Sequence, residues 1–235
     1  DDKSYRCEVQ LGITTDTLDI WGAVTEQTPV PPEALSEHRI RTILSNYMGE
    51  QRQVPPMYSA IKVDGRKLYE YAREGRDVLI KERLVTFHAL DLIRIDSVKK
   101  RFLLDVTCSK GTYLRSLCRD LGVDLGCAAS MSFLLRTASG RFKLEETTTL
   151  EELKEHLDEK LLPVEYPLQG YGRVQVSEGQ GSWFANGGRL DVARVRIIAE
   201  PDPGHDFYGI YQDSRFLGMA ALIEGSLKAH KVFVR

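Results

Sequence analysis

The sequence predicts an α+β protein, with a mixed, mainly antiparallel sheet flanked by helices and a small β-barrel at its C-terminal end. Segments that alternate apolar and polar residues are interspersed with segments of helical periodicity. From about Tyr171 onward, only short β runs separated by turn signals remain, which is typical of a small barrel. With 235 residues, 42% of them hydrophobic, the chain can form two modest domains. We expect the first at residues 1–163 and the second at 171–235.

The stretch Cys108–Gly122 lies at the centre of the predicted first domain. Before it, residues 101–107 alternate as a half-buried strand. Thr112 is the expected N-cap of a following helix, because its hydroxyl can accept a hydrogen bond from a free backbone N–H. Gly122 is the expected left-handed stop of that helix. The apolar residues of the helix recur at i, i+3, i+4 and i+7, which indicates one buried face: Leu114, Leu117, Cys118 and Leu121.

Arg115 is out of place in this helix. It falls in the first turn, where the helix dipole disfavours a cation, whereas Arg119 falls in the expected last turn, where a cation is favoured. Arg115 could reach out to water, or it could pair with a carboxylate or a phosphate. Spacing alone slightly favours the first interpretation.

The other elements of the first domain follow from the same patterns. Lys3–Leu11 alternates as a strand, with Tyr5 on its apolar face, where the ring could simply be part of the core. Residues 33–49 are helical, 84–95 form a largely buried strand, and 126–136 form another strand. Thr149 to Glu152 is a capping box that opens a helix through Leu157. In the loop 14–22, Asp16 and Asp19 are interpreted as local turn formers.

The segment 54–83 forms a separate insertion. Pro55-Pro56 gives an extended entry, and Asp64-Gly65 is a strong hairpin signal. A short helix is expected over residues 67–74. Basic and aromatic residues alternate here, a pattern that fits either a solvated charged face or a grip on a nucleic-acid backbone: Tyr58, Lys62, Arg66, Lys67, Tyr69, Tyr71, Arg73 and Arg76. Residue chemistry alone weighs the two interpretations about evenly.

Composition limits the possible classes of function. The 32 Lys and Arg against 34 Asp and Glu give a net charge of −2, which argues against a uniformly basic nucleic-acid binder. Residues 94–119, however, carry seven basic residues and two acidic ones, enough for a local phosphate-binding strip. The four cysteines form no Cys-x-x-Cys pair, so zinc is not expected, and their scatter suggests reduced thiols in the cytoplasm. No apolar run approaches the ~20 residues that span a bilayer.

Several motifs in order resemble one enzyme family. Lys110 to Leu117, Lys-Gly-Thr-Tyr-Leu-Arg-Ser-Leu, is similar to the arginine motif of the TruB-type pseudouridine synthases, which isomerise the T-loop uridine of tRNA at position 55. Lys3-Ser-Tyr-Arg6 resembles the family's tyrosine motif. Residues 11–22 resemble its Thr-Asp-Thr-x-Asp-x-x-Gly segment, and 54–62 with 67–75 resemble its thumb insertion. The resemblance covers residues 1 to about 163. Beyond it, 183–190 and 216–220 more weakly resemble a PUA RNA-binding domain.

The resemblance implies a role for each matching residue. Arg115 would hold the catalytic aspartate, Tyr5 would stack on a flipped-out uridine, Tyr113 and Leu134 would complete the base pocket, and Lys110 would contact a phosphate. From residues alone, Leu134 would be ordinary core. The thumb would contact RNA through a basic and aromatic set: Tyr58, Lys62, Arg66, Lys67 and Arg73. The resemblance calls for no metal or other cofactor. The expected partner is the T-arm of tRNA, with no membrane, and the expected state is a cytoplasmic monomer.

One departure from the family pattern is large. The family's catalytic aspartate stands in a Gly-x-Leu-Asp-Pro motif, and no Leu-Asp-Pro occurs in these 235 residues. The chain opens at Asp1-Asp2-Lys3 without Met, so we expect a fragment lacking the front of its catalytic domain and inactive alone. The missing part would be a lost segment or a separate chain. The alternatives are a non-catalytic tRNA-binding or RNA-folding protein and the family's guide-RNA-dependent relatives. The bacterial-type thumb sequence Lys67–Arg73 argues against those relatives.

Overall fold

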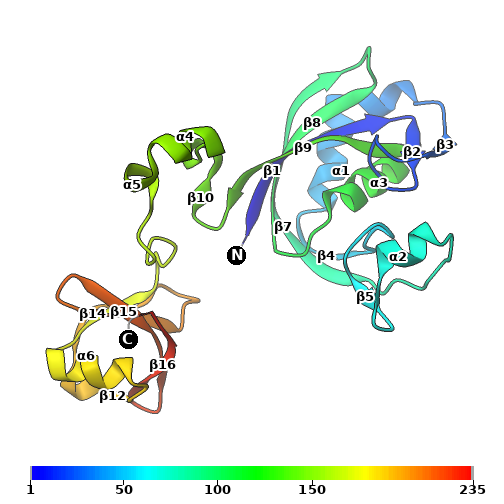
Figure 1. Ribbon diagram of the computed structural model, residues 1–235. Helices are drawn as coiled ribbons and strands as arrows, with labels where there is room; N and C mark the ends of the chain where they lie inside the picture. The colour runs from blue at the N-terminus through cyan, green and yellow to red at the C-terminus, as the bar shows by residue number, and fades with distance from the viewer. Residues whose placement is uncertain (1, 234–235) are drawn as a thin grey trace. The chain divides into compact units, whose positions relative to one another are not determined.

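The structure is a computed structural model that describes residues 2–233. Contacts divide the chain into two compact units, the first ending at Thr147 and the second beginning at Thr148. The boundary expected from the sequence, at Pro163, thus lies within the segment that groups with the second unit. Each unit is described separately below (Figure 1).

The first unit is built on a six-stranded sheet with the order β10-β9-β1-β8-β7-β4. Every neighbouring pair in it is antiparallel, where the sequence predicted a mixed, mainly antiparallel sheet. The strands are β1 (Lys3–Leu11), β4 (Gly49–Gln53), β7 (Arg83–Asp96), β8 (Arg101–Cys108), β9 (Ala129–Ser139) and β10 (Phe142–Lys143). A two-stranded ribbon, β2 (Ile13–Thr15) and β3 (Val24–Gln27), stands beside it. β1 and β8 alternate as expected, and Cys7 lies opposite Leu104 with both fully buried.

Two helices cover the buried face of this sheet, α1 (Glu37–Asn46) and α3 (Leu114–Leu125). Both present one apolar face to the core, as predicted, with Ile40 and Leu44 buried on α1 and Leu117 and Leu121 on α3. The Sγ atoms of Cys7 and Cys118 lie 3.6 Å apart, so α3 packs directly on β1. The short 3₁₀ turns η1 (Pro32–Leu35) and η2 (Leu144–Glu146) also belong to this unit.

The ends of α3 differ from the sequence prediction. Tyr113, not Thr112, is the N-cap, and the Thr112 hydroxyl donates to the carbonyl of Ser109 at 2.9 Å. The helix runs past Gly122 and stops at Gly126, whose φ of 82° provides the left-handed cap. Gly122 is buried inside the helix, where a methyl group would collide with the start of β9. Glycine at this position therefore serves close packing, and Arg119 lies in mid-helix instead of the last turn.

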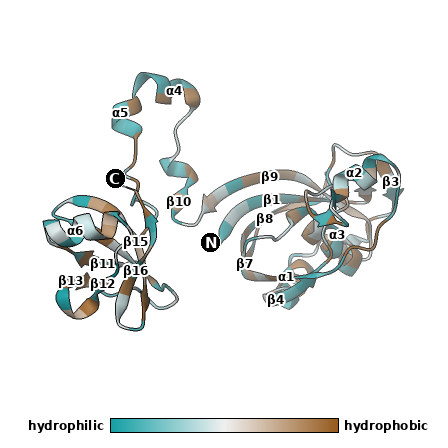
Figure 2. Ribbon diagram, turned by 60° about the horizontal axis from the view of Figure 1, so that its bottom comes forward, coloured by the Kyte–Doolittle hydropathy of each residue, from teal (hydrophilic) through white to brown (hydrophobic). Residues whose placement is uncertain are grey.

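β7 is less buried than its apolar sequence suggested. Of its 14 residues, only Val85, Phe87 and Leu92 are buried. β7 pairs with β4 only from Arg83 to Phe87, so the rest of that edge has no strand beside it. β9 is also open on one side, because β10 pairs with only its last residues. Figure 2 shows hydrophobic segments along β9, and Phe133, Leu134 and Leu135 are 36–46% exposed.

The insertion folds as predicted from its turn signals. The strands β5 (Lys62–Val63) and β6 (Arg66–Lys67) form a hairpin, with Asp64 at φ 49° and Gly65 at φ 82°. The positive φ at both turn positions explains the Asp-Gly pair. α2 (Leu68–Arg73) follows, with Glu74 as its C-cap and Gly75 at φ 65° directly after it. We call residues 54–83 the thumb.

The second unit contains a six-stranded sheet, curved like half a barrel, with the order β12-β16-β15-β14-β11-β13 (Figure 1). Only the β11–β14 pair is parallel. Its strands are β11 (Gly172–Gln175), β12 (Leu190–Asp191), β13 (Arg196–Ala199), β14 (Phe207–Gln212), β15 (Arg215–Ile223) and β16 (Ser226–Val232). Its helices are α4 (Leu150–Glu155), α5 (Leu157–Lys160), α6 (Glu178–Ala185) and the 3₁₀ turn η3 (Val192–Arg194). The predicted capping box opens α4, where the Thr149 hydroxyl accepts from the backbone N–H of Glu152.

Candidate active site

The guanidinium of Arg115 joins three segments that are far apart in the sequence. Its Nη1 donates to the backbone carbonyl of Thr17 at 2.8 Å, and its Nη2 donates to the carbonyl of Tyr58 at 2.9 Å. Nη1 also lies 3.4 Å from Oδ2 of Asp19. Only 22% of the Arg115 side chain is exposed. Arg115 therefore does not reach out to water, and the interpretation that spacing alone favoured is wrong.

Long-range contacts set the position of α3 and hence of Arg115. The Oε1 atom of Gln53, at the end of β4, accepts from the backbone N–H of Tyr113 at 2.8 Å. The Ser116 hydroxyl donates to the carbonyl of Val54 at 2.8 Å. Both bonds tie the first turn of α3 to the chain that enters the thumb. The cation in that turn is compensated by Asp19 and by two carbonyl oxygens, which offset the unfavourable helix dipole.

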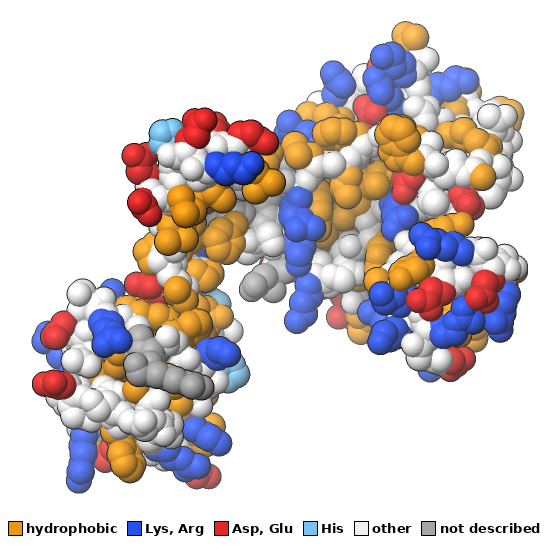
Figure 3. All heavy atoms as spheres, viewed as in Figure 1, with side chains coloured by type: hydrophobic (Ala, Val, Ile, Leu, Met, Phe, Trp, Pro, Cys, Tyr) orange, Lys and Arg blue, Asp and Glu red, His pale blue; other side chains and the backbone are white. Residues whose placement is uncertain are grey.

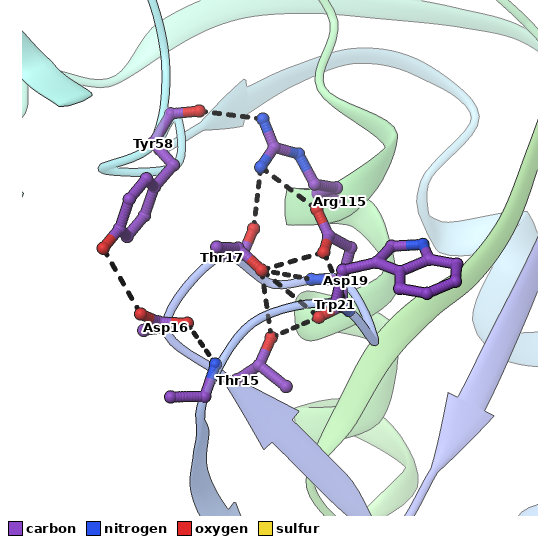
Figure 4. A network of polar contacts seen from close by, with 8 residues as sticks. Thr15, Asp16, Thr17, Asp19, Trp21, Tyr58 and Arg115 are labelled. Atoms are coloured by element: carbon purple, nitrogen blue, oxygen red, sulfur yellow. Dashed lines mark hydrogen bonds and ion pairs between the residues drawn. The ribbon is translucent and has the colours of Figure 1, made fainter.

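The loop 16–23 carries the two acidic residues that the sequence assigned to local turns (Figure 4). They do make local bonds, because Oδ1 of Asp16 accepts from the N–H of Ala23 at 2.8 Å and Oδ1 of Asp19 accepts from the N–H of Trp21 at 3.1 Å. Each also reaches a distant segment. The Tyr58 hydroxyl donates to Oδ2 of Asp16 at 3.3 Å, and Asp19 pairs with Arg115.

The expected base-pocket residues lie in β1, β9 and the start of α3. Tyr5 is 9% exposed, and the guanidinium of Arg136 lies 5.7 Å from the centre of its ring. Leu134 faces the same side of the sheet as Cys7, its partner in the register, and is 42% exposed. An exposed leucine in mid-strand differs from the ordinary core position that residues alone suggested. Tyr113 is half-buried and Lys110 is exposed.

In the thumb, the basic residues lie on aromatic rings. The guanidinium of Arg66 is 4.8 Å from the centre of the Tyr71 ring, and Arg73 and Lys67 flank the Tyr69 ring at 5.3 and 5.4 Å. Arg66 also pairs with Glu74 and lowers the pKa of that carboxyl. Figure 3 shows Lys and Arg side chains gathered over α2 and β5. Glu70 and Glu74 lie among these cations and pair with Arg66, so the surface carries charges of both signs.

The basic stretch 94–119 does not form one strip in space. Lys99 and Lys100 lie at the turn between β7 and β8, whereas Lys110 follows the other end of β8. The length of β8 separates the two ends by about 25 Å, because a strand rises about 3.3 Å per residue. Arg101, close to that turn, is paired with Glu8 and with Asp96. The grouping of basic residues in the sequence thus overstates their grouping on the surface.

Among residues 2–233, no group of three or more His, Cys, Asp or Glu side chains is arranged to hold a metal ion. Within the same residues, no helix has the length and apolar character needed to cross a membrane. All four cysteines are free and buried. Burial raises the pKa of the Cys108, Cys118 and Cys127 thiols.

Sequence reasoning missed the shared role of Asp16 and Asp19 and gave Trp21 no role at all. One signal was available: the misplaced cation of Arg115 required a carboxylate, and the loop 14–22 contains two. The other two acceptors, on Thr17 and Tyr58, are backbone carbonyls. They could not be recognised from the sequence, because every residue has such a group.

Two family models match the chain. One is described as "TruB family pseudouridylate synthase (N terminal domain)" and matches residues 1–114. The other is described as "tRNA pseudouridylate synthase B C-terminal domain" and matches residues 115–169. Together they extend from β1 to the segment just before β11.

Curated relatives match most of the chain. The tRNA pseudouridine synthase B of Alkaliphilus oremlandii is 45% identical over 218 residues, covering 92% of this chain and 71% of the relative. The protein of the same name from Clostridioides difficile is 36% identical over 244 residues, covering 99% of this chain and 79% of the relative.

Solved structures share the fold at lower identity. The chain is similar to one in a Cbf5-Nop10-Gar1 complex, with a TM-score of 0.69 and 21% identity over 99% of this chain and 67% of that one. It is also similar to a chain of an H/ACA RNP bound to a substrate RNA containing 2′-deoxyuridine, with a TM-score of 0.67 and 19% identity over 100% and 66%. These likenesses extend through both units.

Proposed function

Because the chain belongs to the TruB family of pseudouridine synthases, we propose that it is the part of a tRNA pseudouridine-55 synthase that binds the T-arm and presents Arg115 to the catalytic aspartate. The reaction breaks the glycosidic bond of a flipped-out uridine, turns the base, and rejoins it through carbon. The aspartate that serves as nucleophile or base in the family has no Leu-Asp-Pro counterpart in these 235 residues.

The donors of Arg115 carry the proposal. A guanidinium has five N–H donors in a rigid fork. The three hydrogen bonds that it makes among the described residues go to Thr17, Asp19 and Tyr58 and use only Nη1 and Nη2. The Nε donor and one terminal donor remain for a further acceptor. A carboxylate fits this requirement, because a planar fork can bind it through two hydrogen bonds.

The other residues that we propose for the site would bind the RNA substrate around Arg115. Tyr5 and Leu134 occupy neighbouring antiparallel strands, and Tyr113 caps the helix that bears Arg115. Tyr5 would stack on the base, while Leu134 and Tyr113 would line its pocket. Lys110 would contact a phosphate. Tyr58 anchors the base of the thumb, and Lys62, Arg66, Lys67 and Arg73 would contact the T-arm backbone, with the protein acting as a monomer.

The test compares two proteins on unmodified T-arm RNA. We expect the 235-residue chain to bind the RNA and to form no pseudouridine. A fusion that adds the front of the Alkaliphilus oremlandii relative, including any Gly-x-Leu-Asp-Pro segment in it, should form pseudouridine at the T-loop uridine. Changing the Asp of the added segment to Asn should abolish the product without changing RNA affinity. Pseudouridine formed at a normal rate by the 235-residue chain alone would refute the assignment of the nucleophile.

The cations that lie on aromatic rings in the thumb would equally serve a second candidate, a non-catalytic tRNA-binding or RNA-folding protein. It predicts that the fusion binds T-arm RNA but stays inactive, while the 235-residue chain speeds the refolding of denatured tRNA. Product from the fusion would decide for the enzyme.

A further inference from the structure

Trp21 is exposed to an unusual degree for its type. It lies at the tip of the loop 16–23 with 88% of its surface exposed, and its indole points away from the polar network around Arg115 (Figure 4). Single exposed apolar residues are common on protein surfaces and need no explanation by themselves. Trp21 differs because its backbone is fixed and because it stands beside the candidate active site.

The loop that carries Trp21 is held in one conformation. Four hydrogen bonds close it, joining Asp16 with Ala23 twice and Asp19 with Trp21 and Gly22. Leu18 adopts a φ of 63°, which costs a non-glycine residue of its size free energy and persists only where surrounding contacts enforce it.

Contacts with β9 also fix the loop to the sheet. The N–H of Ile20 donates to the carbonyl of Met131 at 3.0 Å, and the N–H of Met131 donates to the carbonyl of Leu18 at 3.0 Å. These bonds lie directly before and after Asp19. The indole is therefore presented from a rigid support, so binding a ligand there requires little ordering of the backbone.

One carboxylate connects the backbone of Trp21 to Arg115. Oδ1 of Asp19 accepts from the backbone N–H of Trp21, while Oδ2 of the same side chain pairs with Arg115. On the other side of the loop, Asp16 accepts from the Tyr58 hydroxyl at the base of the thumb. The backbone of Trp21, Arg115 and the base of the thumb are thus held together through one loop.

We propose that Trp21 stacks on an unpaired nucleobase next to the target uridine and so contributes to recognition of the RNA loop. The inference rests on the proposed function. Flipping the uridine unstacks its neighbours, and an exposed ring beside the site can replace the lost stacking. An indole suits any base, because every base offers a π-face. Trp21 contributes affinity for a looped RNA, and the chemistry stays with Arg115 and its aspartate.

The experiment uses the fact that the chain has two tryptophans, Trp21 and Trp183. In the Trp183→Phe variant, Trp21 is the sole source of tryptophan fluorescence. We expect a T-arm hairpin to quench this emission as it binds, and a fully paired RNA duplex of the same length to leave it unchanged. Trp21→Ala should weaken hairpin binding about 5- to 100-fold, as expected for the loss of one stacked base. Trp21→Phe should keep most of the affinity.

Val98→Ala is the matched control, since Val98 is 92% exposed in the same unit and lies at the turn between β7 and β8. It should leave hairpin affinity unchanged. Hairpin binding that neither quenches Trp21 nor weakens in Trp21→Ala would overturn this inference and leave the proposed function intact. No hairpin binding by the unaltered chain would overturn both. Self-association that Trp21→Ala removes, with RNA affinity unchanged, would assign the indole to a contact between copies and would also overturn the inference.

Discussion

Replacing Arg115 by lysine keeps the charge and removes the planar fork. The guanidinium makes hydrogen bonds to Thr17, Tyr58 and Asp19. The compact ammonium group of lysine lacks the planar fork and can keep about one of these three bonds. Hydrogen bonds to a charged group contribute about 1.5–3 kcal/mol each. Some compensation by water is expected at a side chain that is 22% exposed. We therefore expect Arg115→Lys to lower the free energy of local opening of the loop 16–23 by about 2–3 kcal/mol.

Amide hydrogen exchange of the backbone N–H groups of Trp21, Gly22 and Ala23 measures this directly, since all three donate within the loop. A loss of 2–3 kcal/mol corresponds to exchange that is about 30- to 150-fold faster. In the fusion that carries the catalytic aspartate, Arg115→Lys should slow the single-turnover chemical step strongly and change RNA affinity little. The loop loses stability and the chemical step slows together, because the Arg115 side chain both holds the loop and is proposed to bind the catalytic aspartate.

Arg41→Lys is the matched control for the same exchange of charge. Arg41 pairs with Glu37 one turn away and its side chain is 54% exposed, so the pair contributes at most about 0.5 kcal/mol. Arg119→Lys is a second comparison, with a guanidinium bound mainly to its neighbour Asp120. Equal and mild effects of Arg115→Lys and Arg41→Lys on exchange and turnover would refute the reasoning and make Arg115 an ordinary surface charge.

Three further predictions concern stability and reactivity. Gly122→Ala should destabilise the first unit to urea by about 1–3 kcal/mol, because the added methyl meets the backbone of β9, whereas Gly179→Ala in α6 has open space and should be neutral or stabilising. Cys118 should resist alkylation at pH 8 in the native chain and react in denaturant, as mass spectrometry would detect, because burial raises its thiol pKa. Hydrogen bonds from Thr149 lower the pKa of Glu152 in the folded chain. The stabilisation of α4 by this cap is therefore fully present above the unfolded pKa of about 4.3 and is lost as the pH falls through the lower folded pKa. NMR should detect fraying of α4 at pH 3 but not at pH 6.

Short-range patterns predicted most elements of the fold. The alternation in β1 and β8, the Asp-Gly turn of the thumb and the capping box at Thr149 are all local signals, and the structure confirms each. Helix ends depend on distant partners and were less predictable. The first turn of α3 is capped from outside by Gln53, sixty positions earlier in the chain, and this contact has no local signature.

Gly122 shows why one helix end was misplaced. A glycine that follows an apolar helical face is as consistent with a stop as with a close packing contact. The two possibilities differ only in what faces the glycine. Here the facing element is the start of β9, which leaves no room for a side chain at position 122. The stop falls at Gly126, where φ is positive, so α3 is longer by one turn and Arg119 moves to its middle.

The candidate site could be predicted in part, because residue chemistry exposed a conflict that the local sequence did not resolve. Arg115 in a first helical turn required a compensating charge, and that charge stands at Asp19, 96 positions earlier. Asp19 also satisfies its own loop, so its local bonds were a sufficient explanation until the two segments were seen together. Because the same carboxylate binds Arg115 and the backbone N–H of Trp21, a displacement of Arg115 also displaces Trp21. This coupling implies that Asp19→Asn, which keeps the local acceptor and removes the charge, should loosen Arg115 more than the loop itself.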